Sequence, residues 1–121
     1  MSPRRMPLTL DQQLLRRTMR WARKLRVNPK HVELAELPAK WGSCSPDGVI
    51  TLAHDLVEMS EEFQDYVIVH ELLHLRYRTH GRAFTAMMTA MVPRWRELEE
   101  SSIAREVRHV VPARQEDPDR G

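Results

Sequence analysis

The segment that most constrains this chain runs from Val67 to Phe84 and reads VIVHELLHLRYRTHGRAF. Its first half is mainly apolar, which is typical of a helix that is buried on most of its surface. Two histidines and a glutamate interrupt this apolar run, and the helical periodicity fails at RYRTHG, which contains a third histidine. Any fold of this chain must therefore bury a polar group of three side chains and end the helix shortly after them.

The interruption is an H-E-x-x-H motif formed by His70, Glu71 and His74. Four residues of α-helix turn through about 400°, so the two imidazoles project from one face about 6 Å apart along the axis. Two imidazoles in this arrangement can bind one tetrahedral Zn²⁺. Glu71 is rotated so that its carboxylate can reach a water on the ion but not the ion itself, which predicts a general base.

The third histidine, His80, is expected to complete the ligand set. On a continuous helix it would point about 240° away from His74 and lie about 9 Å further along. It reaches the site only if the helix ends and the chain turns back, and RYRTHG has the residues for such an ending. A pair of histidines and a glutamate facing a core would be costly without partners, which a metal ion supplies. We therefore predict His70, His74 and His80 as metal ligands and Glu71 as the catalytic residue.

The rest of the chain predicts an α+β fold around this helix. Alternation in HVELAEL and in VITLA indicates two strands, with the turn residues of WGSCSPDG between them. Residues 32–53 are therefore expected to form an antiparallel hairpin with SPDG at or near its tip. Apolar periodicity and capping residues predict the helices. They are expected over Leu8–Arg26 with Thr9 or Asp11 as the cap, from Ser60 onward, over 82–91, and from Trp95 to about Val107.

Length and composition set the remaining limits. A chain of 121 residues has room for one domain, placed at residues 1–111, and the polar, proline-containing residues 112–121 are expected to be a disordered tail. No apolar run approaches a membrane span, so no membrane partner is expected. The single cysteine, Cys44, excludes an intramolecular disulfide framework and favours a cytoplasmic location. The net charge of +2 is small, and the many arginines are interpreted as solvated helix faces rather than as a polyanion-binding surface.

Several other side chains of the types that form sites are expected to have structural roles. The remaining histidines are expected at the surface or in packing, and three methionines at helical spacing are expected in the core. Three glutamates late in the chain are candidates for a fourth ligand only in principle. These residues are His31, His54 and His109, then Met87, Met88 and Met91, then Glu97, Glu99 and Glu100.

Three motifs in order, KWGSCSPDGVITL, DYVIVHELLHLRYRTHGRAF and VPRW, resemble the YgjP-like metallopeptidase family, which is related more distantly to SprT-like proteins. The resemblance extends from about Leu8 to Leu98. It implies a minimal zincin-like fold with an N-terminal helix, a small antiparallel sheet, the active-site helix and C-terminal helices. Carried over by position, His70, His74 and His80 correspond to the zinc ligands and Glu71 to the general base.

The resemblance also implies roles for residues around the site. Ile50–Ala53 is expected to be a strand edge that pairs with an extended substrate, although Ala53 stands where the family commonly has asparagine. Cys44 lies in the family's hairpin signature and is interpreted as a packed residue rather than as a thiolate that blocks the zinc. Three nearby arginines either stabilise an oxyanion, bind a phosphate or are solvated; they are Arg76, Arg78 and Arg82.

These expectations combine into a zinc-dependent hydrolase whose default substrate is a peptide or protein. One alternative is hydrolysis of a nucleotide phosphoanhydride, which is associated with some YgjP-like proteins. A second is a DNA-associated protease of the SprT-like kind, which needs a basic segment that the mixed-charge C-terminus does not clearly supply. A non-catalytic binding module is disfavoured by the presence of Glu71. The sequence does not constrain the oligomeric state.

Overall fold

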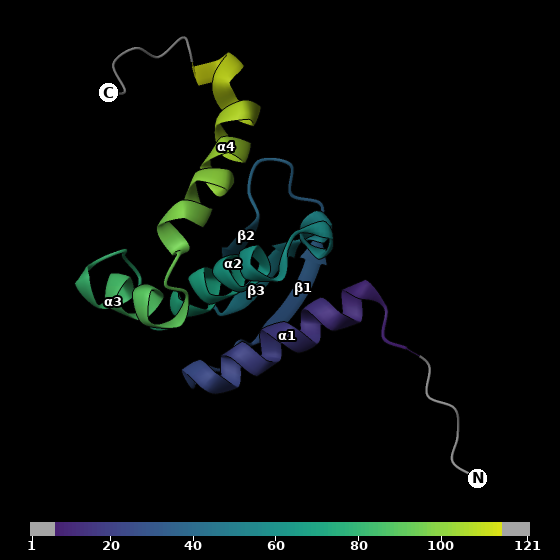
Figure 1. Ribbon diagram of the computed structural model, residues 1–121, viewed down its shortest axis with the longest axis vertical. Helices are drawn as coiled ribbons and strands as arrows, with labels where there is room; N and C mark the ends of the chain where they lie inside the picture. The colour runs from purple at the N-terminus through teal and green to yellow at the C-terminus, as the bar shows by residue number, and fades with distance from the viewer. Residues whose placement is uncertain (1–6, 115–121) are drawn as a thin grey trace.

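The computed structural model describes residues 7–114, with side chains described for residues 7–105. The elements follow in the order α1 (Leu10–Leu25), β1 (His31–Ala35), β2 (Gly42–Cys44), β3 (Val49–Ala53), a 3₁₀ turn η1 (His54–Glu58), α2 (Glu61–Leu73), α3 (Arg82–Met91) and α4 (Trp95–Arg114). Helices α1 and α2 lie in front of the sheet, with α3 and α4 to one side (Figure 1). The predicted α+β class is confirmed.

The sheet has the order β1-β3-β2, so β3 is the central strand. Strand β2 pairs with β3 in an antiparallel hairpin whose tip is the predicted SPDG, where the Ser45 amide donates to the Val49 carbonyl at 2.9 Å. The expectation that the first strand also pairs antiparallel is wrong, because β1 runs parallel to β3. The residues read from the sequence as a turn contain the short strand β2, and this extra strand reverses the chain once more before β3 begins.

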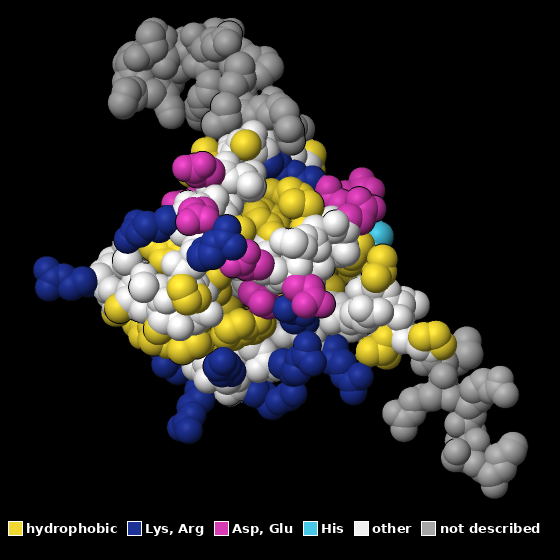
Figure 2. Space-filling view, viewed as in Figure 1, with side chains coloured by type: hydrophobic (Ala, Val, Ile, Leu, Met, Phe, Trp, Pro, Cys, Tyr) yellow, Lys and Arg dark blue, Asp and Glu magenta, His cyan; other side chains and the backbone are white. Residues whose placement is uncertain are grey.

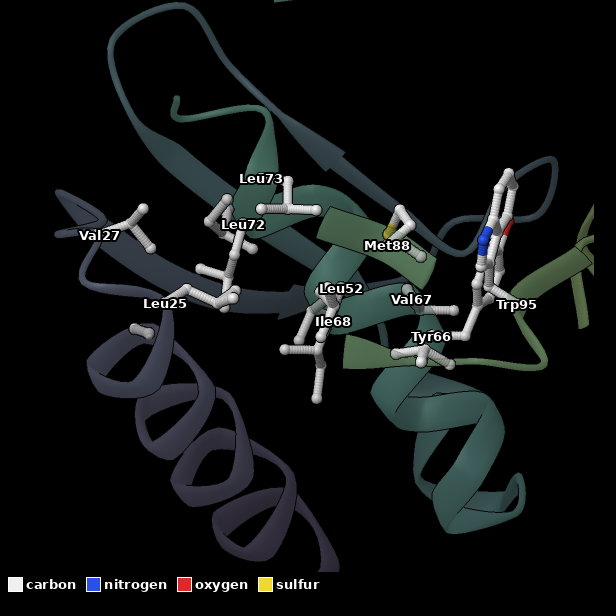
Figure 3. Packing of buried hydrophobic residues seen from close by; sticks show 14 of the residues in the cluster. Leu25, Val27, Leu52, Tyr66, Val67, Ile68, Leu72, Leu73, Met88 and Trp95 are labelled. Carbon is white, nitrogen blue, oxygen red and sulfur yellow. The ribbon is translucent and has the colours of Figure 1, made fainter. Parts of the chain in front are cut away.

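Helix α2 lies at the centre of the molecule and contacts α1, α3, α4 and the sheet. Its residues Ile68 and Leu72 are fully buried, and they meet Ile50 and Leu52, the inward-facing side chains of β3, in one apolar cluster (Figure 3). Full burial of one such side chain contributes about 1.5–3 kcal/mol relative to exposure. The core is therefore built around the helix that carries the H-E-x-x-H motif, and its packing fixes that helix in place.

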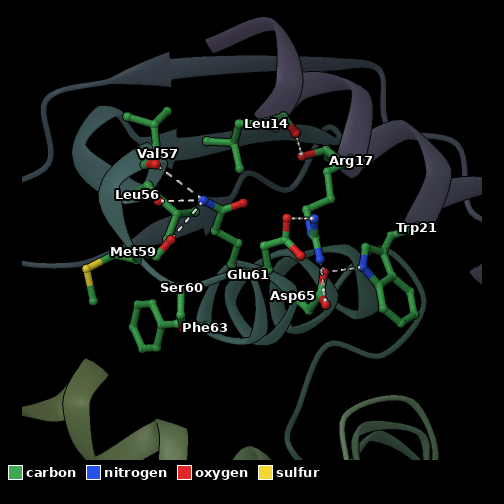
Figure 4. A network of polar contacts seen from close by, with 12 residues as sticks. Leu14, Arg17, Trp21, Leu56, Val57, Met59, Ser60, Glu61, Phe63 and Asp65 are labelled. Carbon is green, nitrogen blue, oxygen red and sulfur yellow. Dashed lines mark hydrogen bonds and ion pairs between the residues drawn. The ribbon is translucent and has the colours of Figure 1, made fainter. Parts of the chain in front are cut away.

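Capping and polar contacts set where α1 and α2 begin and how they are joined. Thr9 forms a capping box at the start of α1, and the Ser60 hydroxyl accepts from the Phe63 amide at the start of α2. Between the helices, Asp65 accepts hydrogen bonds from Arg17 and from the Trp21 indole (2.7 Å; Figure 4). These contacts hold α1 against the outer side of α2.

The exposed side of α1 and the C-terminal part of the chain complete the description. Lysine and arginine side chains gather along the edge of the molecule on which α1 lies (Figure 2). Helix α4 continues to Arg114, beyond the end near Val107 that its sequence predicts. Most of the predicted tail, residues 115–121, lies outside the described residues. Among the described helices, none combines the length and the apolar character that crossing a membrane requires.

Candidate metal centre

The centre is built where α2 ends. His74 is the C-cap of the helix and keeps helical backbone angles, with its amide donating to the Glu71 carbonyl at 3.1 Å. The chain then leaves the helix through tight turns, and the Tyr77 amide donates back to the Leu73 carbonyl at 2.8 Å. This ending brings His80 round to the face of α2 that carries His70 and His74, so the predicted break in the helix is confirmed.

The three imidazoles lie together. Their ring centroids are 5.0 Å apart for His70 and His74, 4.9 Å for His70 and His80, and 4.8 Å for His74 and His80. One nitrogen from each ring lies within 4.8 Å of the others, and the Nε2 atoms of His74 and His80 are 3.0 Å apart. Nitrogen ligands at 2.0–2.1 Å from a tetrahedral zinc ion lie about 3.3 Å from each other. The spacing of the donor atoms therefore fits a shared ion.

Contacts on the other side of each ring orient these donors. His74 Nδ1 lies 3.1 Å from the Tyr77 carbonyl, and since a carbonyl only accepts, Nδ1 must carry the proton and Nε2 the lone pair. His70 Nδ1 lies 3.3 Å from Glu71 Oε2. The ring of Phe84 packs against all three imidazoles, with its centroid 4.5 Å from that of His80. The donor nitrogens thus converge on one point above an apolar floor.

The surroundings also favour the uncharged form of His80. Its pKa lies below the usual value for histidine, first because packing removes water from the ring and then because His70 and His74 lie close by. A histidine must be neutral to bind a metal ion, so this shift extends the pH range in which His80 can be a ligand.

Glu71 is nearly buried, with 8% of its surface exposed, and strand β2 passes directly over it. This close approach requires a glycine at position 42. A Cβ atom added to Gly42 would lie 2.9 Å from Glu71 Cγ and 3.3 Å from both the Thr51 carbonyl oxygen and Val67 Cγ1. The carboxylate is therefore confined between its own helix and the backbone of β2.

Two cavities meet at Glu71 and form a groove past the histidines. One, of about 230 Å³, extends toward α4; it is lined by Lys40, Trp41, Gly42, Tyr66, Val67, His70, Glu71, His80, Glu99, Ser102 and Ile103. The other, of about 530 Å³, extends toward the hairpin tip; it is lined by Cys44, Ser45, Pro46, Glu71, His74, Leu75, Arg76 and Arg78. Strand β2 runs along this groove as an edge strand of the sheet. The arrangement can hold an extended chain across the three histidines.

The strand edge predicted at Ile50–Ala53 is wrong, because β3 is paired on both sides and Ala53 is fully buried. The edge beside the active-site helix is β2 instead. Cys44 lies on β2 at the groove and outside the histidine cluster, and its thiol donates to the Ser45 carbonyl at 3.6 Å. Burial and then the charge of Glu71 raise the pKa of this thiol.

The other histidines and the methionines that are described lie away from the cluster. The His54 ring contacts Asp11 at 2.9 Å and joins η1 to α1, while His31 is exposed and lies 3.5 Å from Glu33. Met88 is fully buried and Met87 and Met91 pack against the core, as predicted. The side chain of His109 lies outside the described residues.

Some residues of the site had no clear signal in the sequence. Phe84 ends the segment VIVHELLHLRYRTHGRAF, but its contact with the imidazoles depends on how the chain turns back after α2. Glu99 and Ser102 come to the groove because α4 folds over it. Gly42 gave no clear signal either, because its segment has the residues of a turn, and only the pairing of β2 with β3 shows that a strand passes close to Glu71.

A family model described as YgjP-like, metallopeptidase domain, matches residues 8–101, which is most of the chain. The chain belongs to the YgjP-like metallopeptidase family. Among solved structures, it is similar to the metallopeptidase zymogen of Pyrococcus abyssi abylysin, with 25% sequence identity and a TM-score of 0.61 over 77% of this chain and 90% of that chain. No curated protein matches the sequence. The family and the structural neighbour support a metallopeptidase, and three histidines stand where a metal ion could be held.

Proposed function

We propose that the protein is a cytoplasmic zinc peptidase in which His70, His74 and His80 hold the ion and Glu71 is the general base. The observation that carries this proposal is the convergence of three ring nitrogens within 4.8 Å of one another, directly beside a confined carboxylate. Three imidazoles and an open position are the donor set of many catalytic zinc sites. A bound zinc ion would supply Lewis acidity, which lowers the pKa of a water and polarises a carbonyl group.

The part assigned to Glu71 follows from its chemistry and its place. Hydrolysis of a peptide bond requires a proton to leave the attacking water and a proton to reach the departing amine. A carboxylate can accept the first proton and deliver the second. Because the backbone of Gly42 lies directly against the Glu71 side chain, Glu71 has little freedom to move toward β2. Pre-organisation of this kind reduces the cost of bringing the base to the reacting atoms.

Strand β2 is proposed as the substrate platform. An extended peptide can add to the edge of a sheet through main-chain hydrogen bonds, with its side chains entering pockets on alternate positions. The two cavities that meet at Glu71 would then receive side chains on the two sides of the scissile bond. Hydrolysis of a nucleotide is the competing proposal, since Arg76 and Arg78 line one of these cavities and arginine binds phosphate well.

The test separates metal binding from catalysis. Glu71→Gln is expected to retain one zinc per chain, measured by elemental analysis, and to lose peptide cleavage. His80→Ala is expected to lose zinc. His54→Ala is the matched control, because its ring contacts Asp11 on α1 instead of the cluster. The substrate panel contains unstructured protein, nucleoside triphosphates and a protein bound to single-stranded DNA. Cleavage by Glu71→Gln, or full zinc content in His80→Ala, would contradict the assignment.

A further inference from the structure

The two ends of the groove differ in charge. The cavity toward α4 is lined by one cation and one anion besides the site residues, Lys40 and Glu99. The cavity toward the hairpin tip is lined by two cations, Arg76 and Arg78, and its one carboxylate is the proposed base Glu71. A substrate that crosses the site therefore meets an electrically mixed surface on one side and a cationic surface on the other.

The two arginines are available to a ligand. Arg76 donates to the backbone carbonyl of Arg26 at 3.0 Å, which fixes where its guanidinium lies without neutralising it. Arg78 is exposed, and within residues 7–105 no carboxylate lies within ion-pair distance of either guanidinium. The nearby carboxylate of Asp47 is engaged by the Ser45 hydroxyl and lies 3.9 Å from the Lys30 ammonium.

The surface of α1 adds further positive charge to that of Arg76 and Arg78. Helix α1 exposes several cations, and its C-terminal end is tied to the cavity by the hydrogen bond that Arg76 donates to the Arg26 carbonyl. This basic surface is the edge of the molecule that carries most of the lysine and arginine side chains in Figure 2. Its members on α1 are Arg16, Arg20, Arg23 and Lys24. Charges that surround a cleft attract ligands of opposite sign and orient them before contact.

We propose that this peptidase selects substrates with aspartate or glutamate on one side of the scissile bond, the side that lies over Cys44–Pro46 and faces Arg76 and Arg78. The inference rests on the proposed function and adds a substrate class to it. Side chains that lie two residues apart on an extended peptide point to the same face, so one substrate can present two carboxylates to this cavity. The planar guanidinium fork matches a carboxylate through two parallel hydrogen bonds, and so arginine suits this task.

The experiment compares zinc-loaded protein on a neutral parent peptide and on derivatives with two glutamates placed before or after the cleaved bond. One derivative is expected to be cleaved with kcat/KM roughly 2- to 30-fold above the parent, since each exposed ion pair changes affinity about 1.5- to 5-fold. The gain should disappear in Arg76→Gln/Arg78→Gln and shrink at high salt, which screens exposed charges. It should remain in part in Arg76→Lys/Arg78→Lys, which keeps the charge but loses the fork. The matched control Arg16→Gln/Arg20→Gln removes the same charge from α1 and should keep most of the gain.

A second measurement keeps this inference separate from the proposed function. Binding of the same peptides to Glu71→Gln, followed by fluorescence anisotropy, needs no cleavage. If wild-type protein cleaves no peptide while binding still favours the acidic derivative through Arg76 and Arg78, the peptidase proposal fails and the site preference stands. Equal binding and cleavage of all derivatives, or a preference that the double glutamine variant retains, would overturn the inference. Tighter binding of a nucleoside triphosphate or of single-stranded DNA than of the acidic peptide would overturn it as well.

Discussion

The substitution Gly42→Ala tests how β2 controls the carboxylate of Glu71, the proposed general base. The added Cβ would stand 2.9 Å from Glu71 Cγ. Carbon atoms in good contact lie about 3.5–4.0 Å apart, so the Glu71 side chain must move by about 0.6–1 Å. The strand itself has little room to retreat, because Gly42 is paired with Leu52 in β3. A misplacement of about 1 Å at a reacting group can reduce the rate by about 100-fold.

We therefore expect Gly42→Ala to lower kcat/KM by roughly 10- to 100-fold while the zinc content stays at the wild-type level, since the three atoms nearest the new methyl group belong to Glu71, Thr51 and Val67 and not to a histidine. Overpacking should also cost about 1–3 kcal/mol of folding free energy. The measurements are peptide cleavage, zinc by elemental analysis and unfolding by denaturant.

Two glycine controls separate the expected effect from general destabilisation. In Gly48→Ala the residue is forced to keep φ of 97°, which costs about 1–2 kcal/mol, but the new Cβ meets Lys30 at 3.5 Å instead of Glu71. In Gly81→Ala, beside His80, the Cβ meets only Thr79 Oγ1 at 3.6 Å, so both stability and activity should change little. If Gly42→Ala stays as active as Gly81→Ala, or if Gly48→Ala loses as much activity as Gly42→Ala, the role assigned to the close approach of β2 is refuted.

Two further predictions concern the scaffold and the thiol. Asp65→Asn should lower the melting temperature by roughly 5–10 °C in calorimetry. The part-buried carboxylate that accepts hydrogen bonds from Arg17 and Trp21 becomes a neutral amide, so about 1.5–3 kcal/mol of the free energy of unfolding is lost. An unchanged melting temperature would contradict this. Cys44 in metal-free protein should react with iodoacetamide at neutral pH more slowly than in the urea-unfolded chain, since its raised pKa leaves less thiolate, and the rate should rise as pH approaches that pKa. Glu71→Gln removes one cause of the shift and should speed the reaction, and equal rates in the two proteins would exclude that cause.

The parts of the fold that local sequence determines were predictable. Capping by Thr9 and Ser60 and the helix break after α2 depend on residues a few positions apart, and the structure confirms each of them. The direction of β1 was not predictable in this way. It depends on whether Gly42–Cys44 is counted as a turn or as a strand, and only pairing with β3 decides that.

The same division holds within the site. The convergence of His70, His74 and His80 could be predicted from one short segment, because its geometry follows from helix periodicity and one helix ending. The strand edge was misplaced because the order of strands in a sheet is a long-range property. The position of Glu99 in the lining of the groove could likewise not be predicted, because no local pattern indicates which face of a later helix folds over an earlier one.

The break at the end of α2 has a consequence for how the molecule is assembled. Because the chain turns back at once, all three histidines proposed as metal donors lie within eleven residues, from His70 to His80. Closing so short a loop costs little conformational entropy. The groove, in contrast, forms only when β2 and α4 arrive from distant parts of the chain. The proposed metal site is thus a property of a peptide-length segment, whereas the proposed recognition of a substrate needs the whole domain to be folded.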